Sequence, residues 1–320
     1  MSSLSEEGFF QQPLKSNNSK EEIKMFTGSL TAIVTPFRNG RVDEAAFKNL
    51  IEFQIANGTN GIVPCGTTGE SATLSYEEHY RVIELAIQSA AGRMPVIAGT
   101  GSNSTAETIA LTKHAEKAGA EAALLITPYY NKPTQQGLFE HYRAVASEVG
   151  LPILLYNVPG RTSVNMLPET VARLSEIKNI VGIKEATGNL QQVSDVLEYS
   201  KKGFIVLSGD DFTTLPLLAI GGHGVISVTS NVVPGMVSDM IKAFNAGKLD
   251  EAKRLHFRLQ PLHRAMFLET NPIPVKTALA MMGMIDGEMR LPLTAMTEAN
   301  RATLSSALKE LGAFSKGGQR

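Results

Sequence analysis

Short hydrophobic, β-branched runs recur at a regular spacing along most of this chain. Each run has the length and composition of a strand that is buried on both faces. There are eight such runs, at Leu30–Val34, Gly61–Pro64, Pro95–Ala98, Ala122–Ile126, Pro152–Tyr156, Ile180–Lys184, Phe204–Leu207 and Gly224–Val228. Amphipathic stretches of helical period separate them, for example at Glu44–Ala56, Tyr76–Ala91, Ala106–Ala118 and Leu138–Val149. The pattern predicts a strict alternation of strand and helix from residue 26 onward.

An alternation of this kind indicates right-handed crossovers between parallel strands. Eight repeats within roughly 220 residues are the number expected of a (β/α)8 barrel, the TIM barrel. A doubly wound sheet is the alternative, but it would carry a glycine-rich phosphate-binding turn after its first strand. The sequence at that place is Val34-Thr35-Pro36-Phe37. We therefore predict the α/β class and a TIM barrel.

The two ends of the chain depart from the alternation. Residues 1–24 are mostly polar and lack the apolar middle of a secretory signal, so we expect a mobile N-terminal tail. The barrel is expected over residues 25–249. Residues 250–320 show no strand pattern, and we predict a C-terminal helical appendage with helices at Glu251–Glu269, Pro274–Met284 and Thr294–Leu311.

Composition narrows the class of protein further. The chain has 320 residues, of which 43% are hydrophobic, and it can bury a large core. Lysine plus arginine (30) balances aspartate plus glutamate (31), which argues against binding to nucleic acid or to an anionic membrane surface. Cys65 is the single cysteine, so no internal disulfide can form, and no apolar run is long enough to cross a bilayer. We expect a cytoplasmic protein without nucleic-acid or membrane partners.

A TIM barrel carries its active site at the C-terminal ends of its strands. In this chain those ends are rich in hydroxyl, phenol and charged groups, at Thr35, Gly66–Ser71, Thr127–Asn131, Tyr156–Arg161, Lys184 and Ser208–Asp211. Lys184 is the most informative, because desolvation at the end of a buried strand favours the neutral amine over the ammonium. A neutral amine is the nucleophile that forms a Schiff base with a keto group. The alternative is a lysine that extends into water or pairs with Glu185.

The neighbouring groups favour Schiff-base chemistry at a keto acid. Taken singly, the Thr67-Thr68 pair fits a helix N-cap, Tyr156 fits a strand aromatic and Arg161 fits a solvated loop charge. Together on one face, they supply a phenol for proton transfer, hydroxyls for a carboxylate and an arginine for a second carboxylate.

Six segments of the chain resemble the dihydrodipicolinate synthase family, namely GTTGESATL (66–74), TPYYNKP (127–133), LYNVPGRT (155–162), GIKEATGN (182–189), LSGDD (207–211) and GGHGVISVT (221–229). The resemblance extends from about Met25 to the C-terminus. It implies a Schiff-base-forming lyase that condenses pyruvate with L-aspartate 4-semialdehyde to 4-hydroxy-tetrahydrodipicolinate, in lysine and diaminopimelate biosynthesis. The alternatives are a superfamily aldolase for N-acetylneuraminate or keto-deoxy sugars, and a non-catalytic ligand-binding barrel. The Thr67-Thr68 pair and Arg161 favour a small carboxylated aldehyde over a sugar.

The resemblance also implies roles for single residues. Lys184 would attack C2 of pyruvate, Tyr156 would transfer protons, and Thr67 would link Tyr156 to Tyr130 of a partner subunit. Substrate contacts are implied for Thr68, Arg161, Ile226 and Gly209, with Arg161 on the carboxylate of the aldehyde. No cofactor is implied beyond the covalent Schiff base, and the expected assembly is a homotetramer, a dimer of dimers.

Metal-dependent aldol chemistry would need a cluster of histidines or carboxylates with an open coordination position. The six histidines are scattered, and His223, near the last strand, fits a structural hydrogen bond. Asp210 and Asp211 fit a helix N-cap, and Cys65 fits a buried thiol without a neighbouring base. No metal site is predicted.

Many members of the family are inhibited by L-lysine in a cleft between subunits. The matching positions in this chain are Ser71, Ala72, Tyr76, His79, Asn103, Glu107 and Tyr129. Glu107 fits the ammonium groups of lysine, whereas Tyr76 departs from the histidine of some relatives. The alternative is that these are ordinary polar residues at helix starts.

Overall fold

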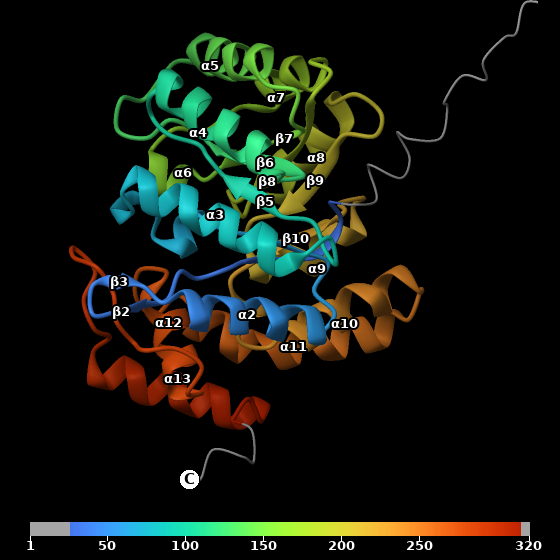
Figure 1. The fold of residues 1–320 in the computed structure, drawn as a ribbon. Helices are drawn as coiled ribbons and strands as arrows, with labels where there is room; N and C mark the ends of the chain where they lie inside the picture. The colour runs from blue at the N-terminus through green and yellow to red at the C-terminus, as the bar shows by residue number, and fades with distance from the viewer. Residues whose placement is uncertain (1–25, 315–320) are drawn as a thin grey trace, which may run out of the picture.

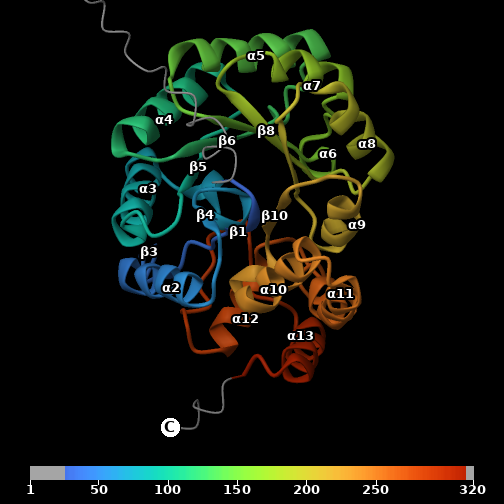
Figure 2. The ribbon, with the colours of Figure 1, turned by 90° about the vertical axis from the view of Figure 1, so that its right-hand side faces the viewer.

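The computed structural model describes residues 26–314 and contains all eight predicted strands in one parallel sheet. The strands are β1 (Gly28–Ala32), β4 (Gly61–Val63), β5 (Ile97–Gly99), β6 (Ala122–Ile126), β7 (Ile153–Asn157), β8 (Ile180–Glu185), β9 (Ile205–Ser208) and β10 (Gly224–Ser227). Their order is β4-β1-β10-β9-β8-β7-β6-β5. Between β5 and β4, Ile62 and Val96 form a parallel bridge that brings the ends of the sheet together. The predicted TIM barrel is confirmed (Figures 1 and 2).

Helices follow the strands and surround them in Figure 2. The Thr134 side chain caps the helix after β6, accepting from Gly137 N at 3.2 Å, so that this helix begins at Gln135 rather than at the predicted Leu138. The barrel helices are α2 (Glu44–Ala56), α3 (Tyr76–Ala90), α4 (Thr105–Ala118), α5 (Gln135–Glu148), α6 (Pro159–Thr162), α7 (Pro168–Ser175), α8 (Leu190–Tyr199), α9 (Thr214–Ala219) and α10 (Pro234–Asn245).

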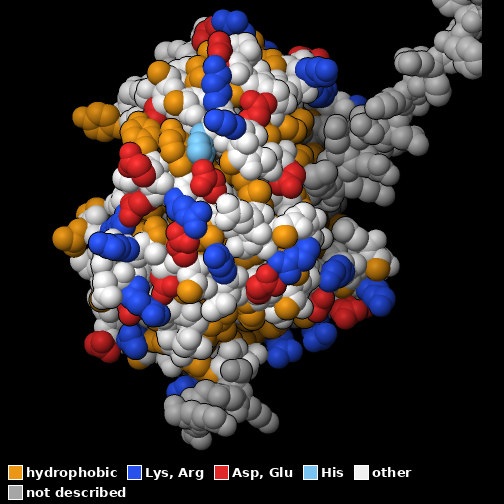
Figure 3. Space-filling view, viewed as in Figure 1, with side chains coloured by type: hydrophobic (Ala, Val, Ile, Leu, Met, Phe, Trp, Pro, Cys, Tyr) orange, Lys and Arg blue, Asp and Glu red, His pale blue; other side chains and the backbone are white. Residues whose placement is uncertain are grey.

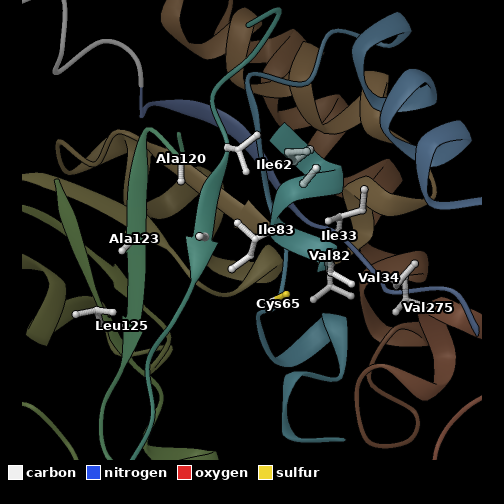
Figure 4. Close-up of a cluster of buried hydrophobic side chains, with 14 of the residues drawn as sticks. Ile33, Val34, Ile62, Cys65, Val82, Ile83, Ala120, Ala123, Leu125 and Val275 are labelled. Atoms are coloured by element: carbon white, nitrogen blue, oxygen red, sulfur yellow. The ribbon is translucent and has the colours of Figure 1, made fainter. Parts of the chain in front are cut away.

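Two layers of hydrophobic side chains hold the barrel together. The inner layer fills the barrel with strand residues such as Leu124 and Leu154. The outer layer packs the strands on the helices, and Figure 4 shows Leu125 of β6 and Ile83 of α3 within it. Leu124 and Leu125 therefore serve opposite faces of one strand, as the hydrophobic pattern predicts for a strand buried on both sides.

Three helices follow the barrel: α11 (Leu249–Ala265), α12 (Ile273–Met281) and α13 (Glu298–Leu311). Their ends lie within four residues of the predicted ones, and the predicted boundary after residue 249 falls in the first turn of α11. Val275 of α12 lies close to Val34 in Figure 4, and Leu304 and Leu308 of α13 belong to the same hydrophobic cluster. This C-terminal helical region therefore shares the outer core of the barrel.

A small hairpin, β2 (Phe37–Arg38) and β3 (Arg41–Val42), was not predicted, because strands of two residues are too short to show an alternating pattern. Its turn is Asn39-Gly40, and both residues have the positive φ that such turns require. The predicted tail, residues 1–24, lies outside the described residues. Within residues 26–314 no helix combines the length and apolar character needed to cross a membrane.

Candidate active site

Two adjoining cavities lie at the C-terminal ends of the strands. The larger has a volume of about 360 Å³, and the smaller, which Lys184 lines, has a volume of about 190 Å³. Four residues line both cavities: Thr67, Tyr156, Arg161 and Asn271. They come from β7, from the loop after β4, from α6 and from the C-terminal helical region, so segments far apart in the sequence build one site.

Lys184, near the C-terminal end of β8, is directed into the smaller cavity. The residue is 5% exposed, and its Nζ lies 4.2 Å from the ring centroid of Tyr156, its neighbour in β7. Its alkyl chain lies along Gly209, where an added Cβ would be 3.0 Å from Lys184 Cε. A lysine that extends into water is therefore excluded.

An ion pair between Lys184 and Glu185 is excluded as well, because successive side chains of a strand point to opposite faces. Glu185 accepts from the backbone N–H of Thr187 at 2.8 Å and from Asn157 Nδ2 at 3.0 Å. Burial raises the pKa of the Glu185 carboxyl group, and these hydrogen bonds oppose the shift. The amine of Lys184 faces Tyr156 instead.

The loop after β4 brings Thr67 and Thr68 to the site. It forms a 3-10 turn, η1 (Thr67–Gly69), and Thr35 Oγ1 donates to the carbonyl of Gly69 at 2.8 Å. Thr67 lines both cavities, whereas Thr68 is buried and lines the smaller one. The N-cap interpretation of the two threonines is wrong, because the residue at the cap position is Gly66, which has no side chain.

A buried ion pair holds the end of this loop. Glu70 has a φ of 53°, and its Oε1 lies 2.5 Å from Nζ of Lys276 in α12. The two side chains are 1% and 0% exposed. Burial lowers the pKa of Lys276, and the Glu70 carboxylate opposes the shift. The second oxygen of Glu70 accepts from the backbone N–H of Arg290 at 3.2 Å, so the C-terminal helical region anchors the loop.

Arg161 lies in the short helix α6 and is exposed, as the loop-charge interpretation expected. It is nevertheless held in place, because its Nη2 donates to the backbone carbonyl of Asn271 at 3.0 Å. The side chain lines both cavities. An arginine at this place can bind a carboxylate of a ligand that enters the site.

The two tyrosines after β6 differ in position. Tyr129 lines the larger cavity and is 38% exposed. Tyr130 is 91% exposed, has a φ of 70° and lines neither cavity. Figure 3 shows hydrophobic side chains gathered at the left-hand edge of the view, beside α4 and α6. Within one chain the structure therefore brings Tyr129, but not Tyr130, to the site.

The remaining residues predicted to contact substrate are Gly209 and Ile226. Gly209 lines the smaller cavity beside Lys184. Ile226 is 1% exposed, belongs to the inner layer of the barrel and lines neither cavity.

The residues considered as metal ligands or nucleophiles make structural contacts. Asp210 caps the turn that follows it, as predicted, whereas Asp211 accepts from backbone N–H groups just after β10. His223 Nδ1 accepts from Val206 N at 3.1 Å, which is the predicted structural hydrogen bond. Cys65 lies in the hydrophobic cluster of Figure 4, and burial raises its pKa. Among residues 26–314 no three His, Cys, Asp or Glu side chains are grouped as metal ligands.

Sequence reasoning missed Asn271 and Lys276. Asn271 is 6% exposed, and its Nδ2 donates to Thr68 Oγ1 at 3.0 Å. In the sequence, Asn271 marks only a break between two helices. No local pattern could have identified either residue, because their partners lie 203 and 206 residues away along the chain.

The residues predicted to bind L-lysine form two groups. Ser71, Ala72 and Tyr129 line the larger cavity. Tyr76 is half exposed and donates to Glu107 Oε1 at 2.6 Å, so this pair joins the starts of α3 and α4.

Three further contacts involve Glu107, His79 and Asn103, which line neither cavity. Glu107 also accepts from Ser102 Oγ, and this hydrogen bond, with the one from Tyr76, lowers the pKa of Glu107. His79 is buried and bonded to a backbone carbonyl, and burial lowers its pKa to about 4. Asn103 accepts, through its backbone carbonyl, a hydrogen bond from the loop after β6.

Comparison with known proteins identifies the family. Residues 25–311 match the model of the Dihydrodipicolinate synthetase family. A relative from Nitratidesulfovibrio vulgaris named 4-hydroxy-tetrahydrodipicolinate synthase is 64% identical over 288 residues, 90% of this chain and 99% of the relative. A chloride-inhibited dihydrodipicolinate synthase from Acinetobacter baumannii, solved in complex with pyruvate, is 50% identical with a TM-score of 0.88, covering 90% of this chain and 99% of that one. An enzyme of this kind from Cyanidioschyzon merolae, solved with lysine bound, is 43% identical with the same TM-score and coverage.

The fold and the site define a TIM-barrel protein with a buried lysine and tyrosine facing each other at the end of the barrel. The chain belongs to the dihydrodipicolinate synthetase family, and it is an enzyme of that family. The family predicted from the six sequence segments is confirmed.

Proposed function

We propose that the chain condenses pyruvate with L-aspartate 4-semialdehyde through a Schiff base on Lys184, giving 4-hydroxy-tetrahydrodipicolinate for lysine and diaminopimelate biosynthesis. The observation that carries the proposal is the buried amine of Lys184, which lies 4.2 Å from the Tyr156 ring in a cavity that Arg161 also lines. The name of the relative that is 64% identical supports the same product.

The first half of the reaction activates pyruvate. The amine of Lys184 attacks C2, the keto oxygen is protonated and leaves as water, and a protonated imine remains. The phenol of Tyr156 gives and takes the protons of these steps. The Thr68 hydroxyl binds the carboxylate of pyruvate. Because the imine withdraws electrons, the methyl group loses a proton and an enamine forms.

The second half joins the two substrates. The enamine carbon attacks the aldehyde carbon, whose oxygen takes a proton and becomes a hydroxyl group. Arg161 binds the carboxylate of the aldehyde substrate, and Gly209, which lies beside Lys184 in the smaller cavity, completes the substrate contacts. The amino group of that substrate then attacks the imine carbon, closes the ring and releases Lys184. Holding both reactants in one site can lower the barrier by roughly 7–11 kcal/mol.

Reductive trapping tests this proposal. Borohydride reduces an imine to a stable amine, so mass spectrometry after incubation with pyruvate should find a pyruvyl adduct on Lys184. The control is Lys184→Arg, which should form no adduct. A native chain without the adduct would overturn the proposal. Turnover with L-aspartate 4-semialdehyde but not with N-acetylmannosamine then separates this function from a sialate aldolase.

We further propose that Tyr130 of one chain enters the site of a second copy. There it would complete the proton relay by contacting Thr67, which links it to Tyr156. The expected assembly is a homotetramer built as a dimer of dimers. The exposure of Tyr130 and the hydrophobic side chains beside α4 and α6 support an interface there (Figure 3).

The proposed mechanism uses the Schiff base on Lys184 and needs no metal ion or organic cofactor. Activity should therefore persist after dialysis against a chelator.

We also propose that L-lysine inhibits the enzyme at a site formed by Ser71, Ala72, Tyr76, His79, Asn103, Glu107 and Tyr129. The lysine-bound relative supports this, as does the Tyr76–Glu107 contact, which places the carboxylate of Glu107 beside the start of α3. We expect partial, cooperative inhibition that Glu107→Ala weakens, with a coupling free energy of roughly 1–3 kcal/mol. Initial rates at millimolar L-lysine, with both substrates near KM, measure this inhibition. Unchanged rates would contradict the proposed lysine site.

A further inference from the structure

Asn271 is the polar residue that the C-terminal helical region contributes to the smaller cavity. It lies between α11 and α12, outside the eight strand–helix repeats, and is 6% exposed. Phe267 is its only neighbour from the same region among the described residues that line the cavity of Lys184. Asn271 also lines the larger cavity, so it lies where both substrates of the proposed reaction would meet.

Asn271 contacts both groups that are proposed to bind substrate carboxylates. Its Nδ2 donates to Thr68 Oγ1 at 3.0 Å, and both residues are buried. Its backbone carbonyl accepts from Arg161 Nη2 at 3.0 Å. The side chain of Asn271 is therefore hydrogen-bonded to Thr68, and its backbone carbonyl is hydrogen-bonded to Arg161.

The direction of the first hydrogen bond has a chemical consequence. A threonine hydroxyl has one proton to donate and can accept two hydrogen bonds. With Asn271 Nδ2 as the donor, Thr68 Oγ1 is the acceptor, and the hydroxyl proton is left for another group. A carboxylate can only accept, so this arrangement prepares Thr68 to bind one.

The surrounding structure fixes Asn271 opposite Thr68. Two residues after Thr68, Glu70 forms the buried ion pair with Lys276, which is five residues after Asn271 in the chain. The loop after β4 and the start of α12 are thus connected at two places, by this ion pair and by the Asn271–Thr68 hydrogen bond.

We propose that Asn271 is a positioning residue that sets the Thr68 hydroxyl as the hydrogen-bond donor to the carboxylate of the keto acid. This inference rests on the proposed function, in which Thr68 binds pyruvate. Asn271 acts through Thr68 and not on the reacting atoms. Its removal should therefore weaken pyruvate binding far more than it slows the chemistry at saturating pyruvate.

Asn271→Leu removes the donor while keeping the approximate size of the side chain. The pyruvate concentration that gives half-maximal borohydride trapping on Lys184 should rise by about tenfold, as expected when a buried hydrogen bond and its partner's orientation are lost. Maximal trapping at saturating pyruvate should stay near native. An unchanged half-saturating concentration would overturn the inference.

A double-mutant cycle separates positioning from a general structural effect. In a Thr68→Val chain, which has no hydroxyl to orient, adding Asn271→Leu should change half-saturation by less than about twofold. An equal rise in both backgrounds would show that Asn271 does not act through Thr68 and would overturn the inference. If Asn271→Leu does not fold, Asn271→Asp serves instead, since its carboxylate accepts the Thr68 proton and should raise half-saturation at least as much.

Failure of this inference and failure of the proposed function give different results. A native chain that forms no adduct on Lys184 at any pyruvate concentration contradicts the Schiff-base function itself. A native chain that forms the adduct, together with an Asn271→Leu chain of native half-saturation, contradicts only the role of Asn271.

Discussion

At the scale of single residues, the position of the Lys184 amine depends on the absence of a side chain at Gly209. An added Cβ would lie 2.5 Å from the Cβ of Ala186 and 3.0 Å from Lys184 Cε. We expect Gly209→Ala to lower kcat by about tenfold or more, since small misplacements of reacting groups are costly. The control is Gly160→Ala, because an added Cβ there meets nothing within 4 Å and should leave the kinetics native. Equal kinetics for the two variants would contradict this account of Lys184.

The phenol of Tyr156 is the proposed proton carrier. Tyr156→Phe removes one hydroxyl group and should keep the fold, yet lower kcat by about 100-fold or more through lost proton transfer. Tyr142→Phe is a matched control, because the Tyr142 hydroxyl donates to the Leu125 carbonyl at 3.3 Å outside both cavities. That control should lose some stability and no activity. Native turnover by Tyr156→Phe would show that another group transfers the proton.

At the scale of elements, α12 holds the loop after β4 through the buried Lys276–Glu70 pair. Lys276→Met leaves a buried carboxylate without its partner, so the free energy of unfolding should fall by about 3–5 kcal/mol. Adding Glu70→Gln should recover part of this loss. Urea unfolding measures both changes.

An exposed ion pair provides the matched control for that experiment. Lys113 and Glu148 lie 2.6 Å apart with side chains about half exposed, so Lys113→Met should cost less than about 1 kcal/mol. Similar losses for Lys113→Met and Lys276→Met would mean that burial does not set the strength of the Lys276 contact.

At the scale of the whole molecule, the proposed exchange of Tyr130 between chains can be tested by complementation. A Tyr130→Phe chain keeps its own Lys184, and a Lys184→Ala chain keeps Tyr130 for its partner. Refolding the two inactive variants together should restore about a quarter of native activity, because half of the dimers are mixed and each mixed dimer has one complete site. As a control, mixing Lys184→Ala with Tyr156→Phe should restore nothing, because Lys184 and Tyr156 belong to the same chain and each mixed site lacks one of them. A Tyr130 that acts within its own chain gives no recovery in the first mixture.

The sequence by itself determined the barrel and the part of the site that the barrel carries. The local composition of runs such as Ile180–Lys184 predicts buried strands. The number and spacing of these runs are enough to predict a TIM barrel. Because all strand ends of such a barrel meet at one side, Lys184 and Tyr156 could be placed together without coordinates. The structure has them as neighbours in β8 and β7.

Tertiary structure alone decided which distant residues complete and hold the site. Asn271 and Lys276 reach Thr68 and Glu70 across more than 200 residues, and neither contact leaves a periodic trace in the sequence. Tyr130 is 91% exposed in a loop where it has a left-handed φ of 70°, and no periodic pattern in the sequence predicts that position. The physical reason is that hydrophobic periodicity records which face of an element is buried, whereas a polar contact between loops depends on how whole elements pack.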